Sequence, residues 1–293
     1  MKILISDPFS KDLPKRLSEF GTVTENKDEF SDADVILVRS ATKVDRAYID
    51  NAKNMKLVIR GGVGLDNIDV NHCNGKGILV KNTPEASSIA VAELVFALML
   101  GITRNVVTAH NSTKKGEWVK GLKGTELYGK TLGVIGLGRI GTEVAKRAKA
   151  FGMNVVTGNE HGRPTEYAHA IPTEDVFSKS DFISLHVPLT DETKGMINKS
   201  TIEKMKDGVI IINTARGKLV NENDLAESLK TGKVKYAGLD VYQQEPPVGS
   251  PLLSLENVLL MPHLGAQTAE NMQRIGDIVY HQIKDFKHAN PKL

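Results

Sequence analysis

One stretch, residues 129–141, constrains the fold of this chain more than any other. It reads Gly129-Lys130-Thr131-Leu132-Gly133-Val134-Ile135-Gly136-Leu137-Gly138-Arg139-Ile140-Gly141. A short apolar strand (132–135) runs into a Gly-x-Gly-x-x-Gly turn and a helix-like segment (139–151), and a second apolar run follows at 153–157. Strand, glycine turn, helix and strand in this order predict the first unit of a dinucleotide-binding sheet.

Each glycine of the turn has a separate physical role in this prediction. Gly136 allows the tight turn, Gly138 lets the backbone approach a pyrophosphate, and Gly141 lets the helix pack closely on the strand. The helix N-terminus offers unpaired N–H groups and the positive end of a dipole to the phosphates. The alternative is a structural glycine turn in a sheet that binds no nucleotide.

Composition limits the other classes of protein. A length of 293 residues predicts two domains, and 40% apolar residues are enough to form their cores. The net charge of +3 comes from 38 basic and 35 acidic residues without a basic run, so we expect no nucleic-acid partner. The single cysteine, Cys73, excludes an intrachain disulfide and a cysteine-cluster metal site, and we expect no metal.

The ends and the apolar runs predict a cytoplasmic protein. The N-terminus reads as a strand rather than a signal peptide. The most apolar run, 89–102, is interrupted by Glu93 and is too short to span a bilayer, so we expect no membrane partner.

The first hundred residues predict a small, complete α/β domain. Short strands alternate with short helices, which is typical of a parallel sheet covered on both faces. The strands are expected at 3–6, 22–24, 35–38, 57–60 and 78–80, and the helices at 11–20, 46–51 and 70–75.

Two segments then separate this unit from the glycine turn. A helix over 87–105 is apolar on nearly every face and is expected to be buried on all sides, as a domain junction, a subunit interface or an ordinary core helix. The polar segment 108–129, which holds Trp118, is expected to be a linker or an arm that contacts a second subunit.

The remaining chain completes the second sheet. Strands at 183–186, 209–213, 236–239 and 258–261, with helices at 200–205 and 222–231, extend the glycine-turn unit to a six-stranded doubly wound sheet. The last helix, 266–287, is expected to cross back to the first domain. We therefore predict an α/β fold: a Rossmann-type doubly wound parallel sheet domain (97–267) inserted in a smaller flavodoxin-like α/β domain (1–96 plus 268–293).

Four polar residues follow apolar strands of this second sheet, where ligands bind in open parallel sheets. They are Arg216, Asp240, Glu245 and His263. Arg216 suits a substrate carboxylate, which it would hold by two parallel hydrogen bonds, or an interdomain salt bridge. Asp240 would face the nicotinamide or serve as a structural helix-cap group.

Arginine, glutamate and histidine at the ends of neighbouring strands fit the reduction of a carbonyl by hydride. An imidazole titrates near neutral pH, so His263 would give a proton to the developing alkoxide. Glu245 would orient His263 and keep it protonated, and Arg216 would bind the carboxylate and polarise the carbonyl.

Six segments in order carry a resemblance to a known family. They are Val38-Arg39-Ser40-Ala41-Thr42-Lys43-Val44, Arg60-Gly61-Gly62-Val63-Gly64-Leu65-Asp66-Asn67-Ile68-Asp69, Gly124-Thr125-Glu126-Leu127-Tyr128-Gly129-Lys130-Thr131-Leu132, Asn213-Thr214-Ala215-Arg216-Gly217, Glu245-Pro246-Pro247 and Pro262-His263-Leu264-Gly265-Ala266. Over nearly its whole length the chain resembles the D-isomer-specific 2-hydroxyacid dehydrogenases, and most of all their D-3-phosphoglycerate dehydrogenase branch.

The resemblance implies an oxidoreductase of serine biosynthesis that uses NAD or NADP, with Arg216, Glu245 and His263 as its catalytic triad. It implies a homodimer built through the cofactor domain, and closure of the two domains over the substrate. The implied substrate-binding residues are Arg39, Arg60, Val63, Gly64, Arg216 and His263. The implied cofactor-binding residues are Gly136, Gly138, Arg139, Ile140, Gly141, Asn159, His186, Val187, Pro188, Thr193, Thr214, Ala215, Arg216, Asp240, His263, Gly265 and Ala266.

Two departures from the family pattern lead to further expectations. The chain stops at Leu293, right after the last helix, so we expect no C-terminal regulatory domain and no serine feedback through one. Asn159 stands where the family usually has an aspartate that binds the ribose hydroxyls. His161 and Arg163 follow and suit a 2′-phosphate, whereas Glu160 disfavours it, so we expect use of both cofactors with a modest lean to NADP.

Three functions fit these observations. The first is oxidation of 3-phosphoglycerate or reduction of 3-phosphohydroxypyruvate. The second is a glyoxylate or hydroxypyruvate reductase on the same scaffold. The third is a non-catalytic nucleotide-sensing binding protein, because the family also resembles transcriptional corepressors. The presence of all three catalytic residue types favours the enzyme.

Overall fold

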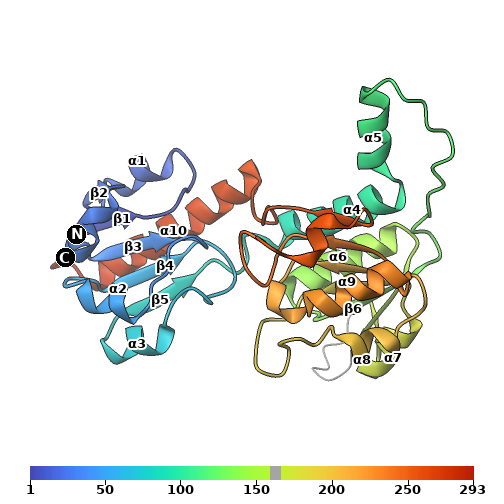
Figure 1. Cartoon of the computed structure of the whole chain (residues 1–293). Coiled ribbons are helices and arrows are strands. Elements are labelled where there is room, and N and C mark those ends of the chain that lie inside the picture. Colours follow the sequence, from blue (N-terminus) through green and yellow to red (C-terminus); the bar gives the residue numbers. More distant parts are fainter. Residues whose placement is uncertain (159–165) are drawn as a thin grey trace. The chain divides into compact units, whose positions relative to one another are not determined.

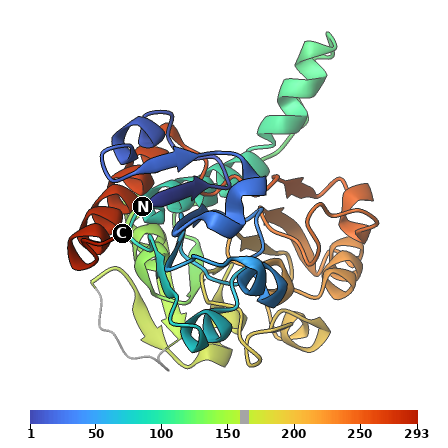
Figure 2. The same ribbon diagram turned by 90° about the vertical axis from the view of Figure 1, so that its left-hand side faces the viewer.

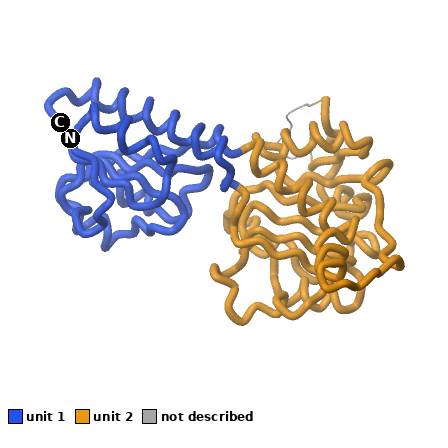
Figure 3. The backbone as a smooth tube through the Cα atoms, turned by 90° about the horizontal axis from the view of Figure 1, so that it is seen from above, with its two compact units in different colours: residues 1–87, 266–293 blue, residues 88–265 orange. Residues whose placement is uncertain are grey.

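The computed structural model describes residues 1–158 and 166–293, and these form two compact units. Unit 1 comprises Met1–Ser87 and Ala266–Leu293, and unit 2 comprises Ser88–Gly265 (Figure 3). The expected boundaries at 96 and 267 therefore differ from those in the structure. The first of them falls inside a helix, Ser88–Thr103, whose whole length packs on the sheet and helices of unit 2.

Unit 1 is built on a parallel sheet of five strands in the order β2-β1-β3-β4-β5. The central strand β3 is apolar and buried at every residue, and its neighbour β1 is apolar after Lys2, as expected for strands covered on both faces. The strands are β1 (Lys2–Ile5), β2 (Thr22–Thr24), β3 (Val35–Val38), β4 (Leu57–Arg60) and β5 (Leu79–Asn82).

Helices cover both faces of this sheet (Figures 1 and 2). The long last helix, α10 (Ala269–Ala289), packs its apolar stripe of Ile275, Val279 and Ile283 against β1, β3 and β4. The other helical segments of unit 1 are α1 (Leu13–Leu17), η1 (Lys27–Asp32), α2 (Arg46–Asn51) and α3 (Val70–Gly75).

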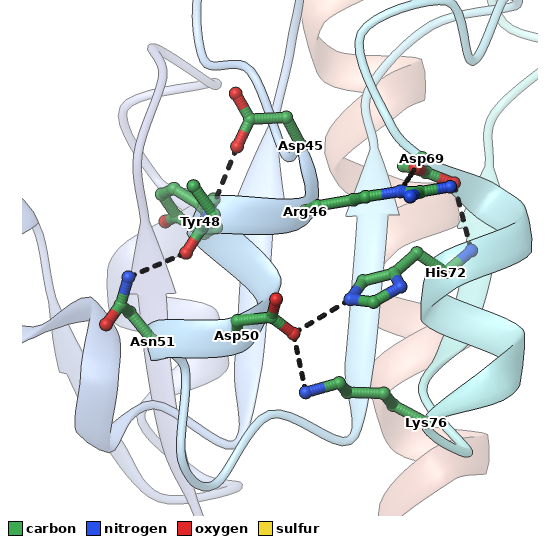
Figure 4. Close-up of polar contacts among 9 residues, drawn as sticks. Asp45, Arg46, Tyr48, Asp50, Asn51, Asp69, His72 and Lys76 are labelled. Carbon is green, nitrogen blue, oxygen red and sulfur yellow. Dashed lines mark hydrogen bonds and ion pairs between the residues drawn. The ribbon is translucent and has the colours of Figure 1, made fainter.

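A polar cluster joins α2 to α3 on the surface of unit 1 (Figure 4). One oxygen of Asp50 lies 2.8 Å from Nε2 of His72 and 2.6 Å from Nζ of Lys76. Beside them, Arg46 contacts Asp69 at 3.2 Å, and Asp69 also caps α3. These contacts hold two short helices that have little apolar surface of their own.

Unit 2 contains a parallel sheet of seven strands in the order β12-β11-β10-β9-β6-β7-β8. The expected six strands are present, and β8 is an additional three-residue strand at the edge of the sheet. The strands are β6 (Thr131–Ile135), β7 (Asn154–Gly158), β8 (His169–Ile171), β9 (Phe182–Leu185), β10 (Val209–Asn213), β11 (Val234–Leu239) and β12 (Val258–Leu260).

The helical segments of unit 2 lie on both faces of that sheet and enclose two apolar clusters. They are α4 (Ser88–Thr103), α5 (Val106–Lys114), α6 (Arg139–Ala150), α7 (Thr173–Lys179), α8 (Lys199–Glu203), η2 (Gly217–Leu219), α9 (Glu222–Thr231) and η3 (Pro251–Ser254). Strand order reverses between β6 and β9, as in a doubly wound sheet. The predicted fold class is thereby confirmed.

The two segments before β6 differ in part from the predicted ones. α4 is not buried on all sides, because Ile89, Glu93 and Ala97 form an exposed stripe at helical spacing. The expected linker or arm at 108–129 contains most of a further helix, α5, which stands clear of the rest of unit 2 (Figures 1 and 2). α5 buries no residue, so its sequence lacks the apolar stripe that usually reveals a helix.

In the described part of the chain, no single helix is long and apolar enough to cross a membrane, and α4 and α5 meet that test only as a pair bent by 61°. Among the same residues, no three His, Cys, Asp or Glu side chains gather as a metal site would require.

Candidate active site

The glycine turn after β6 has the geometry that its sequence predicts. Gly136 has a φ of 97°, which side-chain-bearing residues rarely adopt, and a Cβ there would lie 2.8 Å from the His186 backbone. A Cβ at Gly141 would lie 2.1 Å from the carbonyl oxygen of Gly136, so only glycine lets α6 approach β6 this closely. A Cβ at Gly138, by contrast, would meet nothing within 4 Å.

The start of α6 fits a phosphate group. Gly138 caps the helix without a side-chain hydrogen bond, and the first turn carries no acidic residue. This turn bears Arg139 and Ile140. The open space beside Gly138 and the positive end of the helix dipole suit a pyrophosphate, so these residues fit a dinucleotide.

The carboxyl end of β9 lies beside this turn, because β6 and β9 are neighbours in the sheet. His186 follows β9, and its Nε2 lies 2.8 Å from Oγ of Ser184. Burial of the imidazole lowers the pKa of His186 to about 3, so it is neutral at physiological pH. Val187 and Pro188 continue the chain, and the hydroxyl of Thr193 donates to the Pro188 carbonyl at 2.7 Å.

Asn213, at the end of β10, shapes the loop that carries Arg216. Its buried side chain accepts from the Ala215 N–H at 3.0 Å and donates to the Arg216 carbonyl at 2.9 Å. Thr214 is also buried, and its hydroxyl has no hydrogen-bond partner among the described residues. An unpaired buried hydroxyl at the carboxyl edge of the sheet is a further feature that suits a ligand.

β11 and β12 bring Glu245 and His263 together. Nδ1 of His263 lies 2.7 Å from Oε2 of Glu245, and both side chains remain more than a third exposed, so a small molecule can reach them. The other oxygen of Glu245 accepts from the Tyr242 N–H at 3.2 Å. His263 has a φ of 55°, an unusual value for a residue with a side chain.

Asp240 stabilises the turn after His263. It is 1% exposed, and its two carboxylate oxygens accept from the backbone N–H groups of Leu264 and Gly265 at 2.6 and 2.7 Å. Burial raises the pKa of Asp240, and these two hydrogen bonds partly oppose the increase. Asp240 therefore acts on this backbone turn rather than as a helix cap.

The charges around Glu245 favour an ionic pair with His263. Burial alone would raise the pKa of Glu245, but the hydrogen bond and charge of His263 outweigh it, with help from the Tyr242 N–H and the charge of Arg216, so the net effect is a lowered pKa. The guanidinium of Arg216 itself donates to the Ala215 carbonyl at 2.7 Å.

Within unit 1, the predicted substrate-binding residues lie at the carboxyl ends of β3 and β4. Arg39 donates from Nη1 to Oε1 of Gln267 at 3.3 Å, and burial lowers the pKa of its guanidinium. The Arg60 guanidinium lies against Gly62, where a Cβ would be 2.2 Å from its Nη1. Val63 is exposed, and its carbonyl accepts from Asn82 at 2.6 Å; Gly64 follows it.

The structure thus brings most of the predicted site residues of unit 2 to one edge of its sheet. Gly265 is the last residue of unit 2, whereas Ala266 is the first residue of the second segment of unit 1. Asn159, with Glu160, His161 and Arg163, lies outside the described residues.

Five residues that form hydrogen bonds with the site residues or with their loops were not predicted: Asp7, Asn213, Glu222, Tyr242 and Gln267. Asn213 alone had a local signal, because it lies directly after an apolar strand and before the loop of Arg216.

The fold and this edge define an α/β protein with a Rossmann-type nucleotide site. The family described as "D-isomer specific 2-hydroxyacid dehydrogenase, NAD binding domain" matches residues 96–265. The chain belongs to the D-isomer-specific 2-hydroxyacid dehydrogenase family, as its sequence motifs predict.

Three similar proteins illustrate the range of this family. The D-3-phosphoglycerate dehydrogenase of Methanocaldococcus jannaschii is 49% identical, over 97% of this chain and 57% of that protein, so the chain spans little more than half of its length. The hydroxypyruvate reductase of Thermotoga maritima is 48% identical over 94% of both chains. The crystal structure of D-lactate dehydrogenase from Aquifex aeolicus, complexed with NAD and lactic acid, is 31% identical with a TM-score of 0.88, over 100% of this chain and 97% of that one.

Proposed function

We propose that this chain is a nicotinamide-dependent oxidoreductase that interconverts a D-2-hydroxy acid and its 2-oxo acid. The observation that carries the proposal is the 2.7 Å contact between His263 and Glu245, on the sheet edge that also presents the glycine turn. A proton donor beside a nucleotide site is what carbonyl reduction requires. The bound nicotinamide would supply or accept the hydride.

In this proposal three residues of the chain supply proton transfer, orientation and substrate binding. Nδ1 of His263 faces Glu245, so Nε2 is the atom that donates a proton to the carbonyl oxygen during reduction. Glu245 holds the imidazole in orientation through its contact with Nδ1. Arg216 binds the substrate carboxylate through its planar guanidinium, which also stabilises the negative charge that develops on the carbonyl oxygen.

We propose 3-phosphoglycerate and 3-phosphohydroxypyruvate as the substrate pair, in serine biosynthesis in the cytoplasm. Two features support a second anionic group on the substrate: the similarity to the M. jannaschii protein, and Arg39. The Arg39 guanidinium is partly buried, and a phosphate beside it would compensate for the hydration that it has lost.

The alternative substrate is hydroxypyruvate or glyoxylate. The T. maritima reductase favours it, because that protein matches this chain over 94% of its own length. The two proposals differ in whether Arg39 binds a substrate phosphate. Activity on phosphorylated and unphosphorylated substrates therefore distinguishes them.

Two further parts of the proposal concern the cofactor and the assembly. The sequence that follows β7, with Asn159, His161 and Arg163, supports use of both NAD and NADP with a modest lean to NADP. A homodimer through unit 2 is supported by exposed apolar side chains on and after α5, among them Val106 (53% exposed) and Trp118 (75% exposed).

The test measures the oxidation of NADH or NADPH by its absorbance, with each of four substrates: 3-phosphohydroxypyruvate, hydroxypyruvate, glyoxylate and pyruvate. His263→Ala is expected to lower turnover by roughly 10²–10⁴-fold with little change in cofactor binding. Arg39→Ala is expected to reduce kcat/KM for the phosphorylated substrate more than for glyoxylate. Near-normal turnover of His263→Ala contradicts the catalytic assignment, and equal losses on both substrates contradict phosphate recognition by Arg39.

A further inference from the structure

The loop that carries Glu245 is fixed at both ends by one carboxylate. Glu222 accepts from the Gln243 N–H through Oε1 at 2.7 Å and from the Ser250 hydroxyl through Oε2 at 2.5 Å. These two donors lie on either side of Glu245 in the chain. Glu222 is only 9% exposed, so the hydrogen bonds are shielded from water and stronger than surface contacts.

Local structure explains why a buried carboxylate is stable here. Glu222 is the first residue of α9, after the cap residue Asn221, and a negative charge is favourable at this end of a helix. The side chain of Gln243 adds a parallel attachment, since it donates to the Val220 carbonyl at 2.7 Å. The start of α9 therefore serves as a fixed support for residues 243–250.

The support bears on the pair that is proposed to act in catalysis. Glu245 itself is more than a third exposed, and it makes hydrogen bonds with His263 and with the Tyr242 N–H. An exposed carboxylate on an irregular loop holds one orientation only if the loop backbone is held. Glu222 supplies the hydrogen bonds that hold it.

We propose that Glu222 is a positioning residue: it fixes the 243–250 loop so that Glu245 stays within hydrogen-bond distance of His263. The inference rests on the proposed roles of Glu245 and His263. Loss of Glu222 then lets Glu245 move away from His263, and the alkaline limb of the activity profile, which depends on this pair, moves to lower pH. A merely structural Glu222 would affect stability without moving that limb.

The experiment compares four single variants in the full chain. Glu222→Ala removes both hydrogen bonds. Glu222→Gln keeps their geometry, because its carbonyl can accept from the Gln243 N–H while its amide donates to the Ser250 hydroxyl. Glu227→Ala makes the same Glu-to-Ala change on an exposed side of the same helix and is the matched control. Ser250→Ala removes one hydrogen bond and serves if Glu222→Ala does not fold.

The measurement is the pH dependence of kcat/KM for 2-oxo acid reduction, with the dissociation constant of the cofactor alongside. In Glu222→Ala we expect kcat/KM to fall by on the order of 10–10²-fold, as a misplaced catalytic group does, and the alkaline limb of the profile to move to lower pH. Glu222→Gln should keep most of the wild-type kcat/KM and most of the wild-type position of the alkaline limb. Ser250→Ala should shift the limb in the same direction as Glu222→Ala but by less. Glu227→Ala should match the wild type in both quantities.

The Glu245→Gln variant separates the two hypotheses. If Glu245→Gln moves the alkaline limb and Glu222→Ala moves it no further in that background, both proposals are supported. If Glu245→Gln moves the limb but Glu222→Ala lowers activity equally at every pH, the positioning role is wrong while the proposed function stands. If Glu245→Gln leaves the limb in place, the proposed role of Glu245 fails, and the inference about Glu222 fails with it.

Discussion

Gly138 and Gly141 lie three residues apart, yet a methyl group added to each would have opposite consequences. Gly138 has an extended backbone (φ −78°, ψ −161°) that alanine adopts readily, and the position of its Cβ is open. The Cβ of Gly141 would lie 2.1 Å from a backbone oxygen of Gly136. Gly138→Ala should therefore affect cofactor binding alone, and Gly141→Ala should affect folding as well.

The expected stability changes follow from these contacts. For Gly138→Ala, reduced entropy of the unfolded chain stabilises by about 0.4–1 kcal/mol and the poorer helix cap offsets it, so the net change stays within about 1 kcal/mol. For Gly141→Ala, α6 must move from β6 by roughly 1 Å, and overpacking of this kind costs about 1–3 kcal/mol. At about 2–4 °C per kcal/mol, the melting temperature should fall by about 2–12 °C.

The expected binding change comes from the same geometry. A methyl group at Gly138 enters the space beside the N-terminus of α6, where we place the pyrophosphate. We expect NADH and NADPH to bind about 10–100-fold more weakly, which corresponds to about 1.4–2.8 kcal/mol. Thermal unfolding without cofactor and fluorescence titration with cofactor measure the two effects separately.

Gly75→Ala is the matched control, because Gly75 also has open space at its Cβ position but lies in unit 1. It should alter neither cofactor affinity nor the melting of unit 2. If Gly138→Ala binds both cofactors within about twofold of the wild type, the pyrophosphate does not lie at this turn. If Gly141→Ala melts like the wild type, our account of how α6 packs on β6 is wrong.

Three further predictions test separate parts of the chain. Arg216→Lys keeps the charge but loses the planar fork, so kcat/KM should fall on every substrate, and wild-type values would exclude two-point binding of the carboxylate. Asn159→Asp should shift the kcat/KM ratio toward NADH; a wild-type preference for NADH beyond roughly a hundredfold (about 2.7 kcal/mol) would contradict the lean to NADP. The pKa of Asp50 is lowered, mainly by its hydrogen bond to Lys76, so the stability it contributes is present at neutral pH and is lost as pH falls through that pKa. Asp50→Asn should therefore lower the melting temperature more at pH 7 than at pH 3, and an equal effect at both would contradict this.

Strands were predicted well wherever apolar runs are bounded by polar or glycine residues. The segments 35–38, 57–60 and 209–213 have the bounds that the structure gives them. β8 was missed because it has three residues, two of them exposed, and lies at the sheet edge, where burial imposes no apolar pattern. The predicted boundary at 96/97 differs from the start of unit 2 at Ser88 for a different reason: helix periodicity shows where a helix lies but not which sheet it packs against.

Some of the residues that support the site could not be predicted, because they are far from it in the sequence. Asp7 is 4% exposed, and its carboxylate accepts from the backbone N–H groups of Arg39 and Thr42 at 2.6 and 3.1 Å, across more than 30 residues of chain. Nothing near Asp7 in the sequence indicates this contact. It exists because β1 and β3 are parallel neighbours, so that both carboxyl ends reach the same edge.

The same geometry explains why the His263 and Glu245 pair was easier to predict than its surroundings. Both residues come shortly after parallel strands that pair with each other, so the topology alone brings them to one edge of the sheet. Topology does not orient them. His263 requires a backbone φ of 55°, and the turn that follows it depends on Asp240, which lies after β11 rather than after β12. The sheet thus determines where a site at the end of parallel strands lies, and the periodicity of the sequence predicts the sheet. Hydrogen bonds between loops determine how the side chains of the site are oriented, and periodicity does not predict those hydrogen bonds.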